Sequence, residues 1–170
     1  MACEICKKKE VSVEGKCRSC FVKYLEAKAR KNIHISRNDR VMLMEGQNAG
    51  AKVLGFILDA ILAERNLTVE RSDVPKEGFL IFSLENLDDR NAKFLGEVFR
   101  NISAKTGDKF IFPLADITQA ECEAYCRIKN IEFEKNINSV EDEFIKKIEK
   151  EHIHTRHALG KSQETFDEKN

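Results

Sequence analysis

The chain has 170 residues, a hydrophobic content of 42% and a formal net charge of zero. This length fits one compact domain with a small appendage, and this apolar content excludes a wholly disordered chain. No run approaches the ~18 apolar residues of a membrane span, and charges stand where a signal peptide would be apolar. We therefore expect a cytoplasmic protein that does not contact membranes, in which the six cysteines are kept reduced.

Two cysteine pairs open the chain. Cys3 and Cys6 are two residues apart, as are Cys17 and Cys20, and ten residues separate the pairs. Each pair can offer two thiolates to one ion, and four thiolates complete a closed tetrahedral shell. The sequence therefore predicts a structural Zn²⁺ site in a small knuckle. An iron–sulfur cluster is the alternative, because the same four thiolates can hold one.

After the knuckle, apolar patterns predict alternating helices and strands. Strands are predicted over 40–46, 78–84 and 108–114, and helices over 21–31, 49–66, 88–101, 118–130 and 143–152. Thr118 and Glu121 form a capping box, and Ser139 begins a similar arrangement. Buried strands that alternate with helices indicate an α/β fold with a parallel sheet, reduced here to three or four strands. The predicted units are the knuckle with its helix (1–32), the α/β domain (33–157) and a loose polar tail (158–170).

The net charge of zero conceals a basic N-terminal third. Residues 1–53 carry 12 Lys and Arg against 6 Asp and Glu. A basic surface on a neutral chain indicates an anionic partner, with nucleic acid as the first candidate and ordinary solvated charge as the alternative. The candidate phosphate contacts follow the knuckle: Lys28, Arg30, Lys31, Arg37 and Arg40.

The order of these features resembles tRNA thiolation proteins of the PP-loop, or adenine-nucleotide alpha-hydrolase-like, superfamily. Residues 85–101, ENLDDRNAKFLGEVFRN, resemble a segment that has the sequence His-Asn-x-Asp-Asp in these proteins. Residues 111–133 resemble their Pro-Leu-Arg stretch and the helix after it. Residues 139–166 resemble the C-terminal segment of one branch, cytoplasmic tRNA 2-thiolation protein 2. The resemblance implies a PP-loop (Rossmann-like) domain, here in a shortened form.

Two departures from that pattern predict a degenerate site. Active members hold ATP in a Ser-Gly-Gly-x-Asp-Ser loop, whereas the matching residues here are Glu45, Gly46, Gln47, Asn48, Ala49 and Gly50. A Glu45 charge facing a phosphate charge at 4 Å would cost about 4 kcal/mol at an effective dielectric of 20. Active members also use two cysteines of the α/β domain, but here Cys122 and Cys126 lie on one helix, where simple burial is expected. We therefore expect no catalytic residue and no ATP bound by this chain.

The resemblance then implies a non-catalytic subunit of a cytosolic complex that 2-thiolates the wobble uridine of tRNAs. Its partners would be a catalytic PP-loop subunit in a heterodimer, the tRNA, and a ubiquitin-like sulfur carrier. Two alternatives remain open at this point. One is an active ATP-dependent tRNA sulfur transferase with an atypical loop, and the other is a zinc-ribbon protein-interaction module unrelated to RNA.

Overall fold

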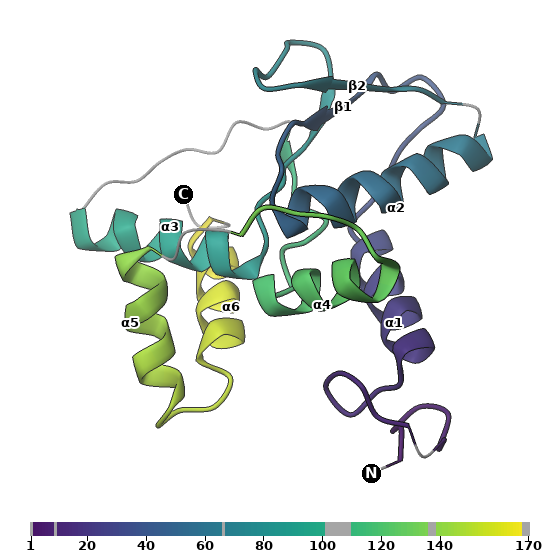
Figure 1. The fold of residues 1–170 in the computed structure, drawn as a ribbon. Coiled ribbons are helices and arrows are strands. Elements are labelled where there is room, and N and C mark those ends of the chain that lie inside the picture. Colours follow the sequence, from purple (N-terminus) through teal and green to yellow (C-terminus); the bar gives the residue numbers. More distant parts are fainter. Residues whose placement is uncertain (1, 9, 66, 101–109, 136–138, 168–170) are drawn as a thin grey trace.

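The computed structural model describes residues 2–8, 10–65, 67–100, 110–135 and 139–167 (Figure 1). Its helices are α1 (Arg18–Arg30), α2 (Ala49–Arg65), α3 (Leu87–Arg100), α4 (Gln119–Lys129), α5 (Val140–Glu149) and α6 (Thr155–Asp167). Its strands are β1 (Val41–Met44), β2 (Val69–Ser72), β3 (Leu80–Phe82) and β4 (Phe110–Ile111). Within these ranges, no helix is long and apolar enough to cross a membrane.

The four strands form one parallel sheet in the order β2-β1-β3-β4. Central β1 pairs on both sides, with Val41 opposite Val69 of β2 and Leu80 of β3. The α/β fold class with a reduced parallel sheet is thereby confirmed. Strand β2 was not predicted, because its sequence VERS carries two charged side chains, which an edge strand tolerates and a central one does not. Residues 73–79 return from β2 to β3 without a helix, which accounts for the shortened core.

The apolar core lies between the sheet and the helices α1, α2 and α4. Helix α2 is apolar on most of its surface because it is covered on several sides. Phe21, Leu25 and Ala29 of α1 belong to the same buried cluster as α2 and α4, and Figure 1 shows α1 and α4 next to α2. Helix α1 and the α/β domain therefore share one core, and the boundary predicted between them at residue 32 does not separate two cores.

The C-terminal helices α5 and α6 pack against α3 (Figure 1). The loose tail predicted from residue 158 is thus wrong as far as Asp167, because these residues continue α6. Gly160 is buried at the contact, where a Cβ atom would lie 2.9 Å from Leu87 Cδ1. A small residue at this position lets α6 approach α3 closely.

Candidate metal centre and the loop after the first strand

The knuckle is shaped by a tight turn between its cysteine pairs. Glu14 and Gly15 both have positive φ angles, of 45° and 73°, and Val13 forms an antiparallel bridge with Lys16. Glycine adopts such a conformation without the steric cost that a side chain adds. The turn returns the chain, so that Cys17 comes back to the first pair and stands as the N-cap of α1.

The structure brings the four predicted cysteines together. The Sγ atoms of Cys3, Cys6, Cys17 and Cys20 all lie within 4.8 Å of one another, and those of Cys6 and Cys17 are 3.6 Å apart. Four thiolates at the usual Zn–S distance of about 2.3 Å would stand roughly 3.8 Å apart in a tetrahedron. Cys3 and Cys17 are buried, whereas Cys6 is exposed. This arrangement can hold a metal ion.

Hydrogen bonds already favour thiolates in part of this cluster. The backbone N–H of Cys6 is the main cause that lowers the pKa of Cys3 to about 6, and that of Cys20 lowers the pKa of Cys17. The side-chain hydrogen bond with Cys17 raises the pKa of Cys20, which stays a thiol. Adjacent negative charges oppose full ionisation of the four groups, and a bound divalent cation removes that opposition.

The loop after β1 packs against the segment that follows β3. A Cβ atom on Gly46 would lie 2.6 Å from Leu84 Cδ1, and one on Gly50 would lie 3.1 Å from the Leu84 carbonyl oxygen. This crevice between β1 and β3 is where the strand order reverses, which is the usual ligand position in an open parallel sheet. Leu84 therefore occupies space beside the loop at that position.

Other residues of the loop are engaged by neighbouring groups. Asn48 Oδ1 accepts a hydrogen bond from the Ala51 backbone N–H at 2.8 Å and so caps α2. The carbonyl of Gln47 accepts one from the Glu134 N–H, also at 2.8 Å. The Ala51 N–H, one of the donors at the start of α2 that could otherwise meet a phosphate, is thus already engaged within the protein.

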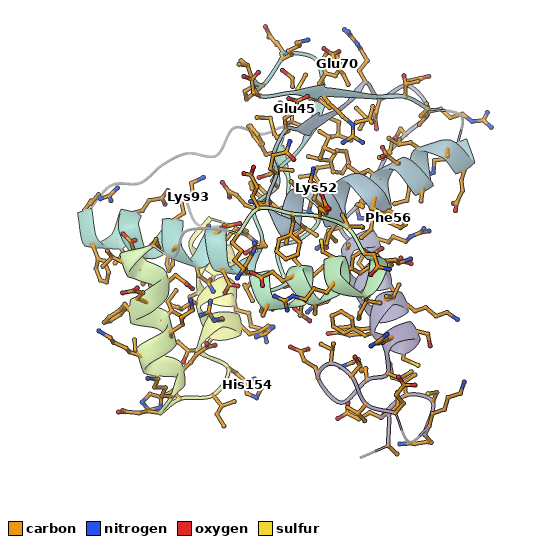
Figure 2. The ribbon with its side chains drawn as sticks, viewed as in Figure 1. Glu45, Lys52, Phe56, Glu70, Lys93 and His154 are labelled. Carbon is orange, nitrogen blue, oxygen red and sulfur yellow. The ribbon has the colours of Figure 1, made fainter. Side chains whose placement is uncertain are left out.

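Glu45 stands at the end of β1 with an exposed side chain (Figure 2). It lines a cavity of about 400 Å³ beside the loop, together with Lys52 and Phe56 of α2. Lys52 Nζ donates to Gln47 Oε1 at 2.5 Å. A carboxylate therefore borders the space next to the loop, and its effect on an anion there stays a prediction.

The two cysteines outside the knuckle are buried, as expected. Cys122 and Cys126 each have an exposed fraction of 0% on α4. Burial raises the pKa of Cys122 well above the ordinary 9.0 and that of Cys126 to about 11. The sequence did not reveal that Cys126 Sγ lies 3.7 Å from the carbonyl oxygen of Ala49, at the start of α2. That contact depends on how α4 packs on α2, which no local pattern encodes.

The five candidate phosphate contacts have different surroundings. Lys28 forms an ion pair with Glu121 at 3.6 Å, and the Arg40 guanidinium stacks over the Phe79 ring at 4.1 Å. The remaining three are exposed, namely Arg30, Lys31 and Arg37. Nucleic-acid contact by any of the five stays a prediction.

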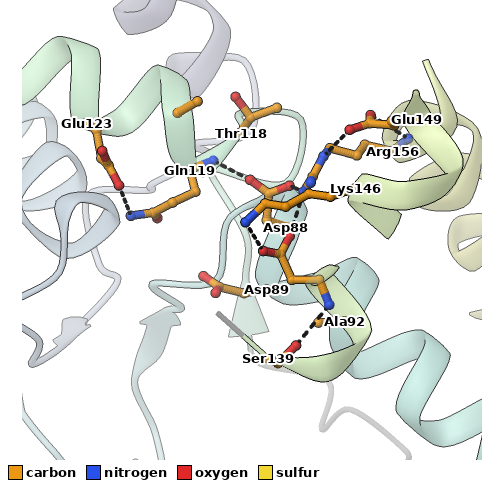
Figure 3. Close-up of a pocket in the computed structure, with 12 residues that line it drawn as sticks. Asp88, Asp89, Ala92, Thr118, Gln119, Glu123, Ser139, Lys146, Glu149 and Arg156 are labelled. Carbon is orange, nitrogen blue, oxygen red and sulfur yellow. Dashed lines mark hydrogen bonds and ion pairs between the residues drawn. The ribbon is translucent and has the colours of Figure 1, made fainter. Parts of the chain in front are cut away.

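A larger cavity of about 600 Å³, which sequence reasoning missed, lies where α3, α4 and α5 begin (Figure 3). Asp88 of the Asn-x-Asp-Asp segment accepts a hydrogen bond there from the Gln119 N–H at 2.6 Å. It also pairs with Arg156, which reaches Asp142 at 3.0 Å and Glu149 at 2.7 Å. Arg156 is only 9% exposed, so it is a buried cation that joins α3, α5 and α6. The only sequence signal was the Asp-Asp pair itself.

We expect Asp89→Asn to be more stable than the wild type at pH 7. Desolvation raises the pKa of the half-buried Asp89 above the ordinary 3.8. As the pH rises, the unfolded chain loses this proton before the folded chain does, so ionisation of Asp89 lowers the free energy of unfolding. Asparagine keeps an oxygen to accept the Asn86 N–H that Asp89 now accepts. Urea unfolding at pH 7 and near pH 3 measures the difference, which should disappear at the lower pH; a less stable variant at pH 7 would contradict this argument.

Comparison with known proteins identifies the fold. No family model matches the sequence, and no curated protein matches it. A solved structure does match, the U34-tRNA thiolase NcsA from Methanococcus maripaludis with its 4Fe-4S cluster. The TM-score is 0.76 at 13% identity, and the alignment covers 99% of this chain and 87% of that chain. At this identity the likeness shows the fold alone, and it agrees with the predicted α/β fold class.

Proposed function

We propose that this chain is a non-catalytic subunit of a complex that 2-thiolates the wobble uridine of tRNAs. The support is a fold shared along 99% of the chain with a U34-tRNA thiolase. One observation carries the non-catalytic part of the proposal: both cysteines outside the knuckle have an exposed fraction of 0%. The resemblance of residues 139–166 to cytoplasmic tRNA 2-thiolation protein 2 supports the same branch.

Covalent sulfur transfer needs an accessible thiolate beside the nucleotide. Cys126 lies next to the loop, but its pKa of about 11 leaves about one molecule in 10,000 ionised at pH 7. Cys122 has no exposed surface, and its pKa is raised as well. A four-cysteine metal shell is closed and likewise offers no free thiolate. In this proposal the reactive cysteines therefore belong to a partner subunit.

ATP is then also bound by the partner. Leu84 packs on Gly46 in the crevice between β1 and β3. Glu45 adds a carboxylate to the cavity beside the same loop. Together with Asp59 it offsets the two cations there, Lys52 and Arg71, so the cavity lining offers a triphosphate no excess positive charge. The proposed complex is therefore a heterodimer in which this chain contributes tRNA binding and scaffolding, and a ubiquitin-like carrier brings the sulfur.

We propose that the knuckle binds a single structural Zn²⁺ ion. All four Sγ atoms lie within 4.8 Å of one another, which is close to the spacing around one tetrahedral ion. In a 4Fe-4S cluster each cysteine thiolate binds a different iron at a corner of the cube. The four cysteine Sγ atoms therefore lie farther apart than they do around a single ion. A single iron ion would fit the same spacing and is distinguished by its visible absorbance.

Depletion of the protein in its own cells tests the proposed function. Total tRNA is then run on a mercury-containing gel, which retards thiolated species. The retarded bands of Lys, Glu and Gln tRNAs should disappear, and a copy with Glu45→Ala should restore them, since the Glu45 side chain is exposed. Persistence of the bands after depletion would refute the proposal and leave a metal-dependent interaction module as the interpretation.

We expect Cys126→Ala to leave tRNA thiolation unchanged. The side chain is buried and protonated, so its removal takes away packing and no reactive group. The same complementation assay measures the outcome, with Cys122→Ala as the matched control on the same helix. Loss of thiolation in the Cys126 variant alone, at equal protein level, would instead favour an active sulfur transferase with an atypical loop.

A further inference from the structure

A cavity of about 390 Å³ lies between the knuckle and α4. Ser12, Val13 and Arg18 line it from the N-terminal segment, and Ala124, Arg127 and Ile128 line it from α4. These two segments are over a hundred residues apart in sequence, and Figure 1 shows the knuckle near α4 at the start of α1. We call this cavity the knuckle cleft.

Both charged groups that line the knuckle cleft are positive. Arg18 and Arg127 are its only charged lining residues in the part of the chain that the structure describes. The Arg18 side chain has no hydrogen bond or ion pair within the described residues, and it is exposed. Arg127 pairs with Glu123 at 2.6 Å, but Glu123 lies one turn earlier and lines the other cavity. Arg18 is therefore the charge in the cleft that a bound anion would neutralise, and Arg127 is a second guanidinium donor on the opposite wall.

The remaining lining groups indicate what kind of anion would bind. Guanidinium groups match phosphate oxygens with paired hydrogen bonds, and the Ser12 hydroxyl is a further donor. Val13, Ala124 and Ile128 give the cleft an apolar wall, which suits the carbon atoms of a ribose. The volume exceeds what one phosphate group alone would fill.

We propose that the knuckle cleft binds a phosphate of an RNA backbone through Arg18 and Arg127. This inference rests on the proposed function, which supplies tRNA as the nucleic acid. Arg18 follows Cys17 directly and is the first residue of α1, so metal binding positions one of the two arginines.

Fluorescence anisotropy with a labelled tRNA transcript and the metal-loaded full chain tests the proposal. Arg18→Gln and Arg127→Gln should each lower the slope of log K against log salt by about 1. The double variant should bind about tenfold more weakly. Arg100→Gln is the matched control, because Arg100 is exposed at the end of α3 and does not line the cleft.

Ala124→Phe separates occupancy of the knuckle cleft from long-range charge, because it fills the cavity and leaves every charge in place. Reduced tRNA affinity with unchanged metal content and thermal unfolding would support binding inside the cleft. A double arginine variant with wild-type affinity and salt slope would overturn the proposal, while the mercury-gel result would still stand for the function. A free mononucleotide that binds the wild type but does not displace tRNA would also overturn the proposal. The cleft would then be a mononucleotide site, and the tRNA would bind elsewhere.

Discussion

We expect that replacing Cys17 by serine abolishes metal binding by the four-cysteine cluster and destabilises α1 together with the knuckle. Cys17 is one of the four clustered thiols and directly precedes α1, so a metal ion held there fixes the start of this helix. Serine is itself a favourable N-cap residue and Cys17 makes no side-chain capping hydrogen bond, so any loss of stability reports the metal site and not the cap. Structural zinc sites of this kind bind with about 10–16 kcal/mol at pH 7, so loss of one thiolate removes a large part of the local folding free energy. Helix α1 contributes Phe21 and Leu25 to the main core, so the destabilisation reaches the α/β domain.

Metal analysis and thermal unfolding by circular dichroism measure this result. We expect one zinc ion per wild-type chain, a colourless protein, and a lower melting temperature after chelation or in the variant. Glu10→Ala is the matched control, because Glu10 is an exposed knuckle residue that makes no side-chain hydrogen bond or ion pair within the described residues. A Cys17→Ser protein that keeps one ion per chain and the wild-type melting temperature would show that the four cysteines are not a joint site.

Arg156→Met will destabilise the folded chain by about 3 kcal/mol, the lower end for a broken buried pair, because it leaves the half-buried carboxylates of Asp88 and Glu149 without their cation. Arg156 contacts Asp88, Asp142 and Glu149 from three directions and is almost fully buried. Methionine keeps much of the volume, so the loss reports charge more than packing. For a domain of this size, the melting temperature should fall by roughly 10 °C.

Urea unfolding of two further variants tests the cause. Arg127→Met removes an exposed pair on one helix and should change stability by less than about 0.5 kcal/mol. Adding Asp88→Asn to Arg156→Met should recover part of the loss, because Arg156 is the cation that pairs with Asp88 within the described residues. Asparagine keeps an oxygen for the Gln119 N–H. A loss below about 1 kcal/mol in Arg156→Met would show that solvent compensates these carboxylates.

The features predicted from the sequence are those that local patterns encode. The spacing of the cysteine pairs indicated that Cys3, Cys6, Cys17 and Cys20 act together, because a two-residue gap can direct two thiolates at one ion. The capping box of Thr118 and Glu121 lies within four residues, and the structure confirms it. Apolar runs likewise placed β1, β3 and α2, since a strand or helix buried on most sides needs little else to be recognised.

What the sequence did not show depends on contacts between distant segments. Strand β2 is held by pairing with β1 and has a charged sequence. Helix α6 is polar and packs against α3 through Gly160, although glycine disfavours helices when considered alone. Leu84 closes the crevice beside Gly46 only because β1 and β3 are neighbours in the sheet. Each of these features required the three-dimensional arrangement.

The position of α4 in the core has a consequence for synthesis on the ribosome. Helix α2 is covered by α4, which follows about sixty residues later in the chain. At 5–20 residues per second, this apolar helix waits on the order of 10 s before its cover is translated. Strand β3 is also synthesised within that interval. Apolar residues that are buried in the folded protein are therefore exposed together on the nascent chain. Chaperone binding during translation should therefore concentrate on chains whose synthesis has passed residue 65 and has not yet reached residue 130.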